Sequence, residues 1–330
     1  MRILLTISAT IFLLSASGQD YILSQYFNAP LMLNPALTGN MEMDLRASIG
    51  RRNQWASISN AFVTTTASYD MPLLRKNNSP NYLGVGGFVL KDKAGKSQLG
   101  LLQATGSVAY AVGMSKYNTL MSGLQVSYGQ RSIQMSDLAW DSQFNGIGYD
   151  PSLGSGENFS SEKRSSVDLS AGVVWSHHKD VDYTLGYMFS HYGQRQGFLG
   201  GASDKLFTKH VFHADWMRKW RHVDLTLQAK AARQSGAMEL NLGVQGKYRT
   251  GLDSKYTDSR TSSAVMAGAY YRIGDAISPM IGYEYQRMII AWFSYDINIS
   301  KLHLASAYNG GWEVHLAYNG WLTQQRRKLH

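Results

Sequence analysis

The 330-residue chain contains no cysteine, which excludes disulfides, thiolate metal sites, a cysteine nucleophile and an acylated N-terminal cysteine of the lipoprotein type. Charged residues make up 17% of the chain, compared with roughly 25% in typical soluble domains. Proline is scarce, with six residues, and beyond the N-terminus no window approaches 18 consecutive apolar residues. These absences argue against a disulfide scaffold, an ordinary soluble domain and a helical membrane protein.

Residues 1–18 have the features of a secretory signal peptide. Arg2 is a short basic region, and the apolar region 3–14 is shorter than the ~20 residues of a membrane-spanning helix. Small residues at 16–18 predict cleavage that leaves Gln19 as the first residue of an exported protein. A buried soluble helix is the alternative interpretation of the same residues.

Aromatic residues and glycine are abundant instead, with 20 Tyr, 8 Trp and 32 Gly. Near the C-terminus, residues 289–299 alternate between an apolar and a polar face. The apolar face holds Ile289, Ala291, Phe293, Tyr295, Ile297 and Ile299, and the polar face holds Trp292, Ser294, Asp296 and Asn298. Successive side chains of a strand point to opposite sides, so this pattern predicts a strand with two different faces.

The same alternation recurs along most of the chain and predicts about fourteen strands. Their expected ranges are 43–52, 61–71, 81–91, 99–112, 117–130, 165–177, 181–192, 208–220, 222–233, 237–250, 262–274, 277–287, 289–299 and 311–321. Many reach ten or more residues, which is longer than the 5–6 usual in globular sheets and suits tilted membrane-spanning strands. Residues 19–40 do not alternate, and their two prolines predict an irregular plug or periplasmic segment.

We therefore predict an all-β fold, a transmembrane outer-membrane β-barrel of about 14 antiparallel strands over residues 41–321. The last strand is expected to pair with the first, because an open edge is not tolerated in a bilayer. Residues 322–330 are expected to form a short basic periplasmic tail. A soluble β-sandwich also alternates, but its strands are shorter.

The lengths of the connections fit this barrel only in part. If both termini are periplasmic, the long connections 131–164 and 193–207 face outward, as is usual for outer-membrane barrels. However, 251–261 would then be a long inner connection and Gly274-Asp275 a tight outer one. This conflict suggests that one strand is miscounted.

The predicted lumen carries charges of both signs. The acids are Asp168, Asp215, Asp224, Glu239, Glu284, Asp296 and Glu313, and the bases are Lys230, Lys247, Arg249, Arg272 and Arg287. A selective pore more often shows a ring of one sign. We therefore expect a salt-bridged and largely closed lumen.

Few residues suggest catalysis or metal binding. His213 and Asp215 share a face, and Ser170 or Ser294 could supply a hydroxyl, but residues two apart on a strand lie about 6.5–7 Å apart. The adjacent pair His177-His178 would point to opposite faces. We expect no enzymatic activity, no metal and no cofactor. The formal charge of +9 is dispersed, apart from 326–328, so nucleic acid is not an expected partner.

Two groups of motifs carry a resemblance over nearly the whole exported chain. Near the N-terminus these are Ser24-Gln25-Tyr26-Phe27-Asn28, Asn34-Pro35-Ala36, Gly39, Arg51-Arg52-Asn53-Gln54-Trp55 and Ser68-Tyr69-Asp70-Met71-Pro72. Near the C-terminus they are Gly282-Tyr283-Glu284, Ser294-Tyr295-Asp296-Ile297-Asn298-Ile299-Ser300 and Gly310-Gly311-Trp312-Glu313. In these motifs the chain resembles the PorP/SprF family of Bacteroidetes outer-membrane proteins. It departs from the family pattern in having Arg51 where a tyrosine is expected.

The resemblance implies an outer-membrane barrel that works with the type IX secretion system. Its implied partners are the C-terminal domain of a secreted surface protein such as a gliding adhesin, other secretion components, a peptidoglycan-associated periplasmic protein and outer-membrane lipid. It implies a role in secreting that cargo or anchoring it at the cell surface, whereas a general diffusion channel is the alternative. The signature residues expected to have structural or partner roles are Gln25, Tyr26, Asn34, Pro35, Gly39, Arg51, Gln54, Trp55, Tyr295, Asp296, Asn298, Ser300, Gly310, Gly311 and Glu313.

Overall fold

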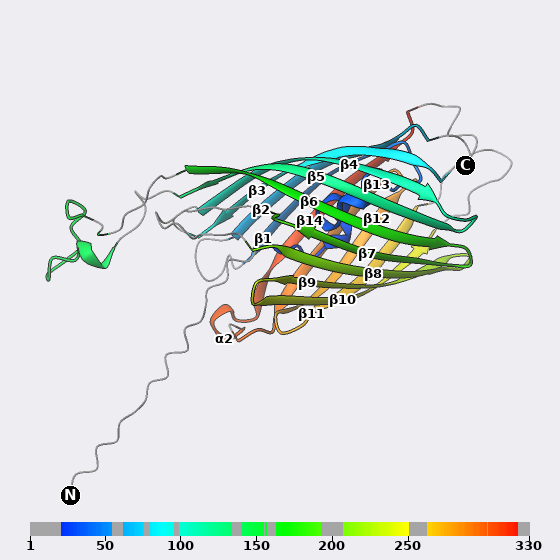
Figure 1. Ribbon diagram of the computed structural model, residues 1–330. Coiled ribbons are helices and arrows are strands. Elements are labelled where there is room, and N and C mark those ends of the chain that lie inside the picture. Colours follow the sequence, from blue (N-terminus) through cyan, green and yellow to red (C-terminus); the bar gives the residue numbers. More distant parts are fainter. Residues whose placement is uncertain are drawn as a thin grey trace, which may run out of the picture.

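The computed structural model describes residues 21–54, 62–75, 80–95, 99–133, 140–154, 156, 163–192, 207–250, 263–301 and 303–322. Within these residues, fourteen antiparallel strands form one closed barrel in which each strand pairs with its neighbours in sequence and β1 pairs with β14 (Figure 1). The predicted fold and its closure are therefore confirmed. No helix in the described residues is long and apolar enough to cross a membrane.

Each predicted strand corresponds to one observed strand, with ends that differ by a few residues at most. The strands are β1 (Leu45–Gln54), β2 (Phe62–Leu73), β3 (Tyr82–Ala94), β4 (Leu99–Gly113), β5 (Asn118–Ser132), β6 (Lys163–His178), β7 (Val181–Ser190), β8 (Lys209–Lys219), β9 (Val223–Gln234), β10 (Ala237–Arg249), β11 (Ala264–Arg272), β12 (Ala276–Tyr285), β13 (Ile289–Asn298) and β14 (Asn309–Gly320). A short helix, α2 (His303–Ser306), lies in the β13–β14 connection. The irregular N-terminal segment is described from Tyr21 onward.

The two faces of the strands separate apolar from polar side chains. On β13, Ser294 and Asp296 are 0% and 3% exposed, whereas Phe293 and Tyr295 are 46% and 37% exposed. β12 alternates between buried and exposed positions over its full length. The outer surface thus presents an apolar band suited to lipid, and the polar face of each strand points into the lumen.

The barrel has two rims, which we name by the ends of the chain. The terminal rim is where β1 begins and β14 ends, and the distal rim is the opposite one. The strand ends that the long β5–β6 and β7–β8 connections join lie at the distal rim, as does α2 (Figure 1). The strand ends joined by the β10–β11 connection lie at the terminal rim, and the short β11–β12 turn lies at the distal rim. The connection lengths suggested that one strand was miscounted. That suggestion is wrong, because the barrel has the fourteen predicted strands and still has connections of these lengths.

The N-terminal segment lies inside the barrel, where Figure 1 shows it as short coiled turns between the strands. These turns are η1 (Tyr26–Asn28), α1 (Pro30–Leu33) and η2 (Pro35–Leu37). Both prolines occupy the first position of a helical turn, where a missing N–H costs nothing. The prolines that predicted an irregular segment therefore start turns in it, and we call residues 21–44 the plug.

Candidate functional site

One end of the plug is held by two carboxylates of the last two strands. The Ser24 backbone N–H donates to Glu313 Oε2 at 2.8 Å, and the Ser24 hydroxyl donates to Asp296 Oδ2 at 2.7 Å. The Gln25 side-chain amide donates to the Ser294 hydroxyl and to the Glu313 carbonyl, both at 2.9 Å. The plug is therefore bonded to β13 and β14 through both its backbone and its side chains.

Two arginines neutralise these carboxylates from neighbouring strands. Arg52 of β1 lies 2.7 Å from Asp296 and 3.9 Å from Glu313, and Arg272 of β11 lies 3.2 Å from Asp296. All four side chains are buried. Buried charges are stable only when they are paired and hydrogen-bonded, so each member of this group depends on the others. We call Ser24, Gln25, Arg52, Arg272, Asp296 and Glu313 the polar clamp.

The opposite side of the plug packs directly on the backbone of the wall at three glycines. They are Gly84 of β3, Gly123 of β5 and Gly172 of β6. A Cβ atom on each would lie 2.0 Å from the Thr38 carbonyl, 2.4 Å from the Pro35 carbonyl carbon and 2.1 Å from Asn34 Oδ1, respectively. Such distances leave no space for any side chain, so only glycine permits this approach. We call these three residues the glycine seat.

Hydrogen bonds from the plug to the wall reinforce the glycine seat. The Asn34 amide nitrogen donates to the carbonyls of Val173 and Tyr187 at 3.3 and 3.2 Å, while its oxygen caps η2 by accepting from the Ala36 N–H. The Thr38 hydroxyl lies 2.6 Å from the Ser107 hydroxyl. The plug thus bridges two opposite walls of the barrel.

The exit of the plug toward β1 is held separately at the terminal rim. Gly39 adopts a positive φ of 73°, and its N–H donates to Asp70, which also receives two bonds from Arg46. Arg75, in the β2–β3 connection, donates to the backbone carbonyls of Gly39 and Met41. The positive φ at Gly39 is one that residues with a side chain rarely adopt.

The plug separates two chambers in the lumen. A distal chamber of about 550 Å³ begins at Tyr21 and Ile22. A terminal chamber of about 470 Å³ is lined by plug residues 40–43 and by the terminal ends of several strands. Because the same short segment lines both, the chain crosses the lumen from the distal side to the terminal side before β1 begins.

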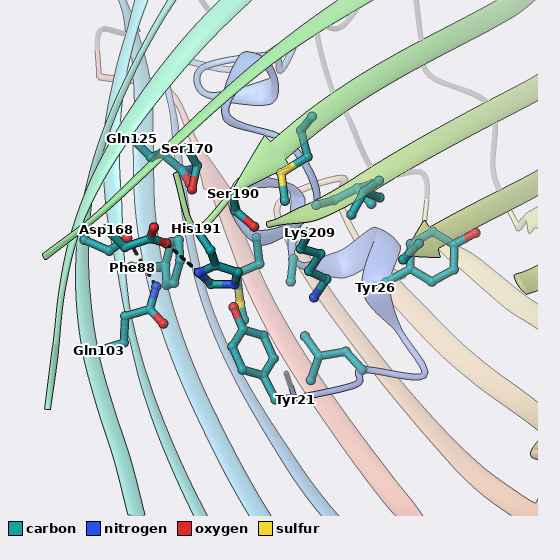
Figure 2. Close-up of a pocket in the computed structure, with 18 of the residues that line it drawn as sticks. Tyr21, Tyr26, Phe88, Gln103, Gln125, Asp168, Ser170, Ser190, His191 and Lys209 are labelled. Carbon is teal, nitrogen blue, oxygen red and sulfur yellow. Dashed lines mark hydrogen bonds and ion pairs between the residues drawn. The ribbon is translucent and has the colours of Figure 1, made fainter. Parts of the chain in front are cut away.

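A smaller cavity of about 70 Å³ lies between the plug and strands β3 to β9. Figure 2 shows Tyr21 and Tyr26 of the plug on one side and a polar wall on the other, where Asp168 pairs with His191 at 2.8 Å. Burial raises the pKa of the Tyr26 phenol, which therefore stays neutral. Lys230 lies over the Tyr26 ring, 4.9 Å from its centre.

Charges of opposite sign pair along the lumenal side of the wall. The pairs are Lys230 with Glu239, Lys247 with Glu284, Arg249 with Asp224, and Lys219 with Asp182. The prediction of a salt-bridged lumen is confirmed by these pairs. They join neighbouring or nearby strands, so they stiffen the wall and fill the interior.

A family model for the type IX secretion system membrane protein PorP/SprF matches residues 15–318, nearly the whole chain. The chain belongs to the PorP/SprF family. No curated protein sequence matches it. The family is one of secretion-system membrane proteins and is not a known enzyme class.

Solved structures resemble this PorP/SprF chain in fold. The toluene transporter TbuX of Ralstonia pickettii has a TM-score of 0.54 and 12% identity, with 90% of this chain and 94% of that chain covered. The CymD monoaromatic hydrocarbon channel has a TM-score of 0.52 and 12% identity, with 89% and 93% covered. At this identity the likeness establishes the fold alone. Family and fold together support an outer-membrane location.

Many of the predicted signature residues meet in the plug and its contacts. Gln25, Asp296 and Glu313 belong to the polar clamp, whereas Asn34 and Pro35 rest on the glycine seat. The others placed inside the barrel are Tyr26 and Gly39 of the plug. Residues from both ends of the sequence therefore form one connected structure.

Four further signature residues, Asn298, Ser300, Gly310 and Gly311, shape β13, β14 and the distal rim. A Cβ on Gly310 would lie 2.5 Å from the Asp296 carbonyl, and one on Gly311 would lie 2.5 Å from the Asn53 carbonyl. Gly310 lies opposite a register shift, because Asp296 pairs with Gly311 and Ile297 pairs with Asn309. In the loop that follows β13, the Asn298 side chain donates to Ser306 and accepts from the Ser300 N–H.

Three further signature residues lie outside both of these groups. Arg51 and Tyr295 point outward, and the Tyr295 hydroxyl donates to Asn309. Gln54 lines the distal chamber. Trp55 lies outside the described residues, as do residues 1–20 of the predicted signal segment and 323–330 of the predicted tail.

The signature residues expected from the sequence did not include Arg52, the arginine of β1 that faces the lumen. Arg52 is the buried member of the Arg51-Arg52 pair. The signal was present, since alternation places Arg51 on the same side as the exposed Ile49. Arg75 and the glycine seat left no such signal, because their partners lie far away in sequence.

The histidines considered for catalysis or metal binding make structural contacts. His213 Nε2 lies 3.2 Å from the Asn34 amide nitrogen, and its Nδ1 lies 3.7 Å from Asp215. Across the described ranges no hydrogen bond joins His213 to a serine. His177 and His178 contact different residues, Asn118 and Asp182, respectively. His213 thus supports the plug, which accounts for its burial.

Proposed function

We propose that this PorP/SprF barrel is an accessory of type IX secretion that binds the C-terminal domain of a secreted surface protein at its distal rim. The cargo, such as a gliding adhesin, would be held there for secretion or for anchoring at the cell surface. The observation that carries this proposal is the plug, which is tied to opposite walls of the barrel. A lumen closed in this way favours binding at a rim over passage through the barrel.

The contacts of the plug argue against a general diffusion channel. The polar clamp holds the plug to β1, β11, β13 and β14, whereas the glycine seat holds it to β3, β5 and β6. Breaking one side of a buried charge network costs about 3–5 kcal/mol, so thermal opening of the clamp is rare. A channel for general diffusion requires an open path, and the plug occupies the middle of the lumen.

The distal rim offers a structured element for capture. In the β5–β6 connection, Phe144 and Tyr149 form an isolated bridge around a tight turn, in which Asn145 Oδ1 accepts from the N–H groups of Ile147 and Gly148. Ile147 is 95% exposed at the tip. An apolar side chain presented on a hydrogen-bonded turn loses little conformational freedom on binding, which favours a protein partner.

The orientation follows from the loops and the family. Outer-membrane barrels keep short turns on the periplasmic side and longer loops outside, and the longest connection here is at the distal rim. The distal rim would then face the cell surface, where cargo is displayed. The terminal rim would face other secretion components and a peptidoglycan-associated protein in the periplasm.

The proposal is tested by replacing residues 140–154 with a Gly-Ser linker of the same length in the full chain. The barrel should remain folded, as judged by its heat-modifiable mobility in gel electrophoresis. The co-purifying surface protein of the wild-type barrel should be lost from the complex and from the cell surface. Unchanged cargo display refutes a role for this loop, and high conductance of the wild-type barrel in planar bilayers supports the channel instead.

A further inference from the structure

The distal chamber is large and lies next to the distal rim. Two of its charged residues, Asp92 and Arg131, form no ion pair with a described residue. The ends of β1–β5, β10 and β11 and the β11–β12 turn form its walls, and Tyr21 and Ile22 of the plug form its floor. Its charged lining residues are Asp92, Arg131, Glu239, Arg272 and Asp275. What each of these charges contacts decides which ligand the chamber can accept.

Three of the five charges are already paired. Glu239 lies 2.7 Å from Lys230, and Arg272 pairs with Asp275 as well as with Asp296 of the polar clamp. They hold the wall together, so they are not available to a ligand.

The other two charges are different. Asp92 accepts one hydrogen bond, from the Thr64 hydroxyl at 2.6 Å, and forms no ion pair with a described residue, although the Arg52 charge acts on it from a distance. Arg131 makes no hydrogen bond or ion pair with any described residue. A guanidinium group carries five N–H donors and pairs best with a carboxylate.

The strand register places these two groups in one row. Asp92 of β3 lies opposite Leu101 of β4, and Leu101 lies opposite Arg131 of β5. Partners directly opposite each other share a face, so all three side chains point into the chamber. Two inter-strand spacings separate the acid from the base by about 10 Å, with an apolar side chain between them.

The remaining lining is largely apolar on both sides. It includes Tyr21, Ile22, Phe62, Leu99, Met238 and Ile273. A matching ligand has a carboxylate at one end, apolar groups next to it and N–H donors about 10 Å away. An extended polypeptide has these features at its carboxyl terminus, where side chains alternate with amide N–H groups.

We infer that the distal chamber binds the carboxyl-terminal end of a partner polypeptide. Arg131 receives the terminal carboxylate, Leu101 and the apolar walls pack against the last side chains, and Asp92 accepts from the peptide N–H groups. If the bound terminus belongs to the cargo domain, this inference deepens the proposed function and rests on it.

An anionic lipid fits the chamber less well. A fatty acid could pair with Arg131, but its chain would cover Asp92 without offering a donor, and burying an unpaired carboxylate is costly. A phosphorylated lipid headgroup would bring further negative charge toward Asp92. The acid in the row is therefore the feature that favours a peptide.

The test uses the purified full-length barrel in detergent and a pool of random synthetic octapeptides in two forms. One form has free terminal carboxylates and the other has terminal amides. The variants are Arg131→Gln and, as a matched control, Arg51→Gln, which removes an outward-facing arginine of β1. Heat-modifiable mobility confirms that each variant is folded.

The wild-type barrel and the Arg51→Gln control should retain the free-carboxylate pool about ten-fold more strongly than the amidated pool, as one charge-assisted contact allows. In Arg131→Gln the difference should disappear. Equal retention of the two pools by the wild type, or an unchanged preference in Arg131→Gln, overturns the inference. The inference is also overturned if the barrel retains palmitate through Arg131 but retains neither peptide pool, because the chamber would then bind an amphiphile.

A second comparison separates this inference from the proposed function. The co-purifying cargo domain is tested intact and without its last five residues. Loss of binding on truncation supports both proposals. Equal binding of both forms leaves the proposed function standing and removes the chamber as the cargo site. Failure of the intact domain to bind refutes the proposed function, while the peptide pools still decide whether the chamber binds carboxyl termini.

Discussion

Replacing Gly123 with alanine should unseat the plug from the wall of β5. The new Cβ would lie 2.4 Å from the Pro35 carbonyl carbon and 2.5 Å from the Ala36 nitrogen. Ordinary contacts begin at 3.4 Å, so η2 must move by about 1.0 Å (3.4 − 2.4) if the strand holds its place. Both atoms belong to the backbone of a turn that begins with proline, so they cannot move out of the way by side-chain rotation.

A shift of this size affects three hydrogen bonds. Those from Asn34 to the carbonyls of Val173 and Tyr187 are already 3.3 and 3.2 Å long, and the Thr38 contact with Ser107 is 2.6 Å. Losing three bonds at about 1 kcal/mol each removes about 3 kcal/mol from the seated state. Since 1.4 kcal/mol is a factor of ten, the unseated population rises about 100-fold.

Cysteine labelling measures this population directly, because the chain contains no other cysteine. Leu31 of α1 is 1% exposed against Phe88 and Leu90 of β3, so a Leu31→Cys reporter reacts with a charged maleimide only when the plug leaves the wall. Labelling should be about 100-fold faster with Gly123→Ala than in the reporter alone. Gly106→Ala is the matched control, since its Cβ would meet nothing within 4 Å. Equal labelling rates with Gly123→Ala and Gly106→Ala would refute the idea that the glycine seat holds the plug against the wall.

Two further predictions concern buried charge. Arg52→Leu should destabilise the barrel by about 3–5 kcal/mol because Asp296 loses a buried partner, whereas Arg51→Leu should change stability little. Urea unfolding of the two variants in the same detergent compares their stabilities. Equal losses of stability would contradict the inward position of Arg52. Lys247→Met should likewise destabilise by leaving Glu284 buried without its cation, and adding Glu284→Gln should restore most of the loss in a thermal melt. A double variant no more stable than Lys247→Met would show that this pair is not what supports the wall.

The sequence by itself determined the strands and their faces. The alternation in β13 predicted that Ser294, Asp296 and Asn298 face the lumen, and their burial confirms it. It also determined the closure of the barrel, because a chain of long two-faced strands cannot leave an edge in a bilayer. Both results follow from the two-residue period of a strand, which is a local property of the chain.

Only the tertiary structure decided what the lumenal side chains contact. Ser24 and Asp296 are 272 residues apart, and Asn34 and Val173 are 139 apart, so no local pattern links them. The motif around Arg51 drew attention to the outward arginine, whereas the clamp uses Arg52. Gly123 resembles any other glycine of a strand until η2 is placed against it. A strand's own period sets which side of the wall a residue occupies, but its partner across the lumen exists only after the barrel has closed around the plug.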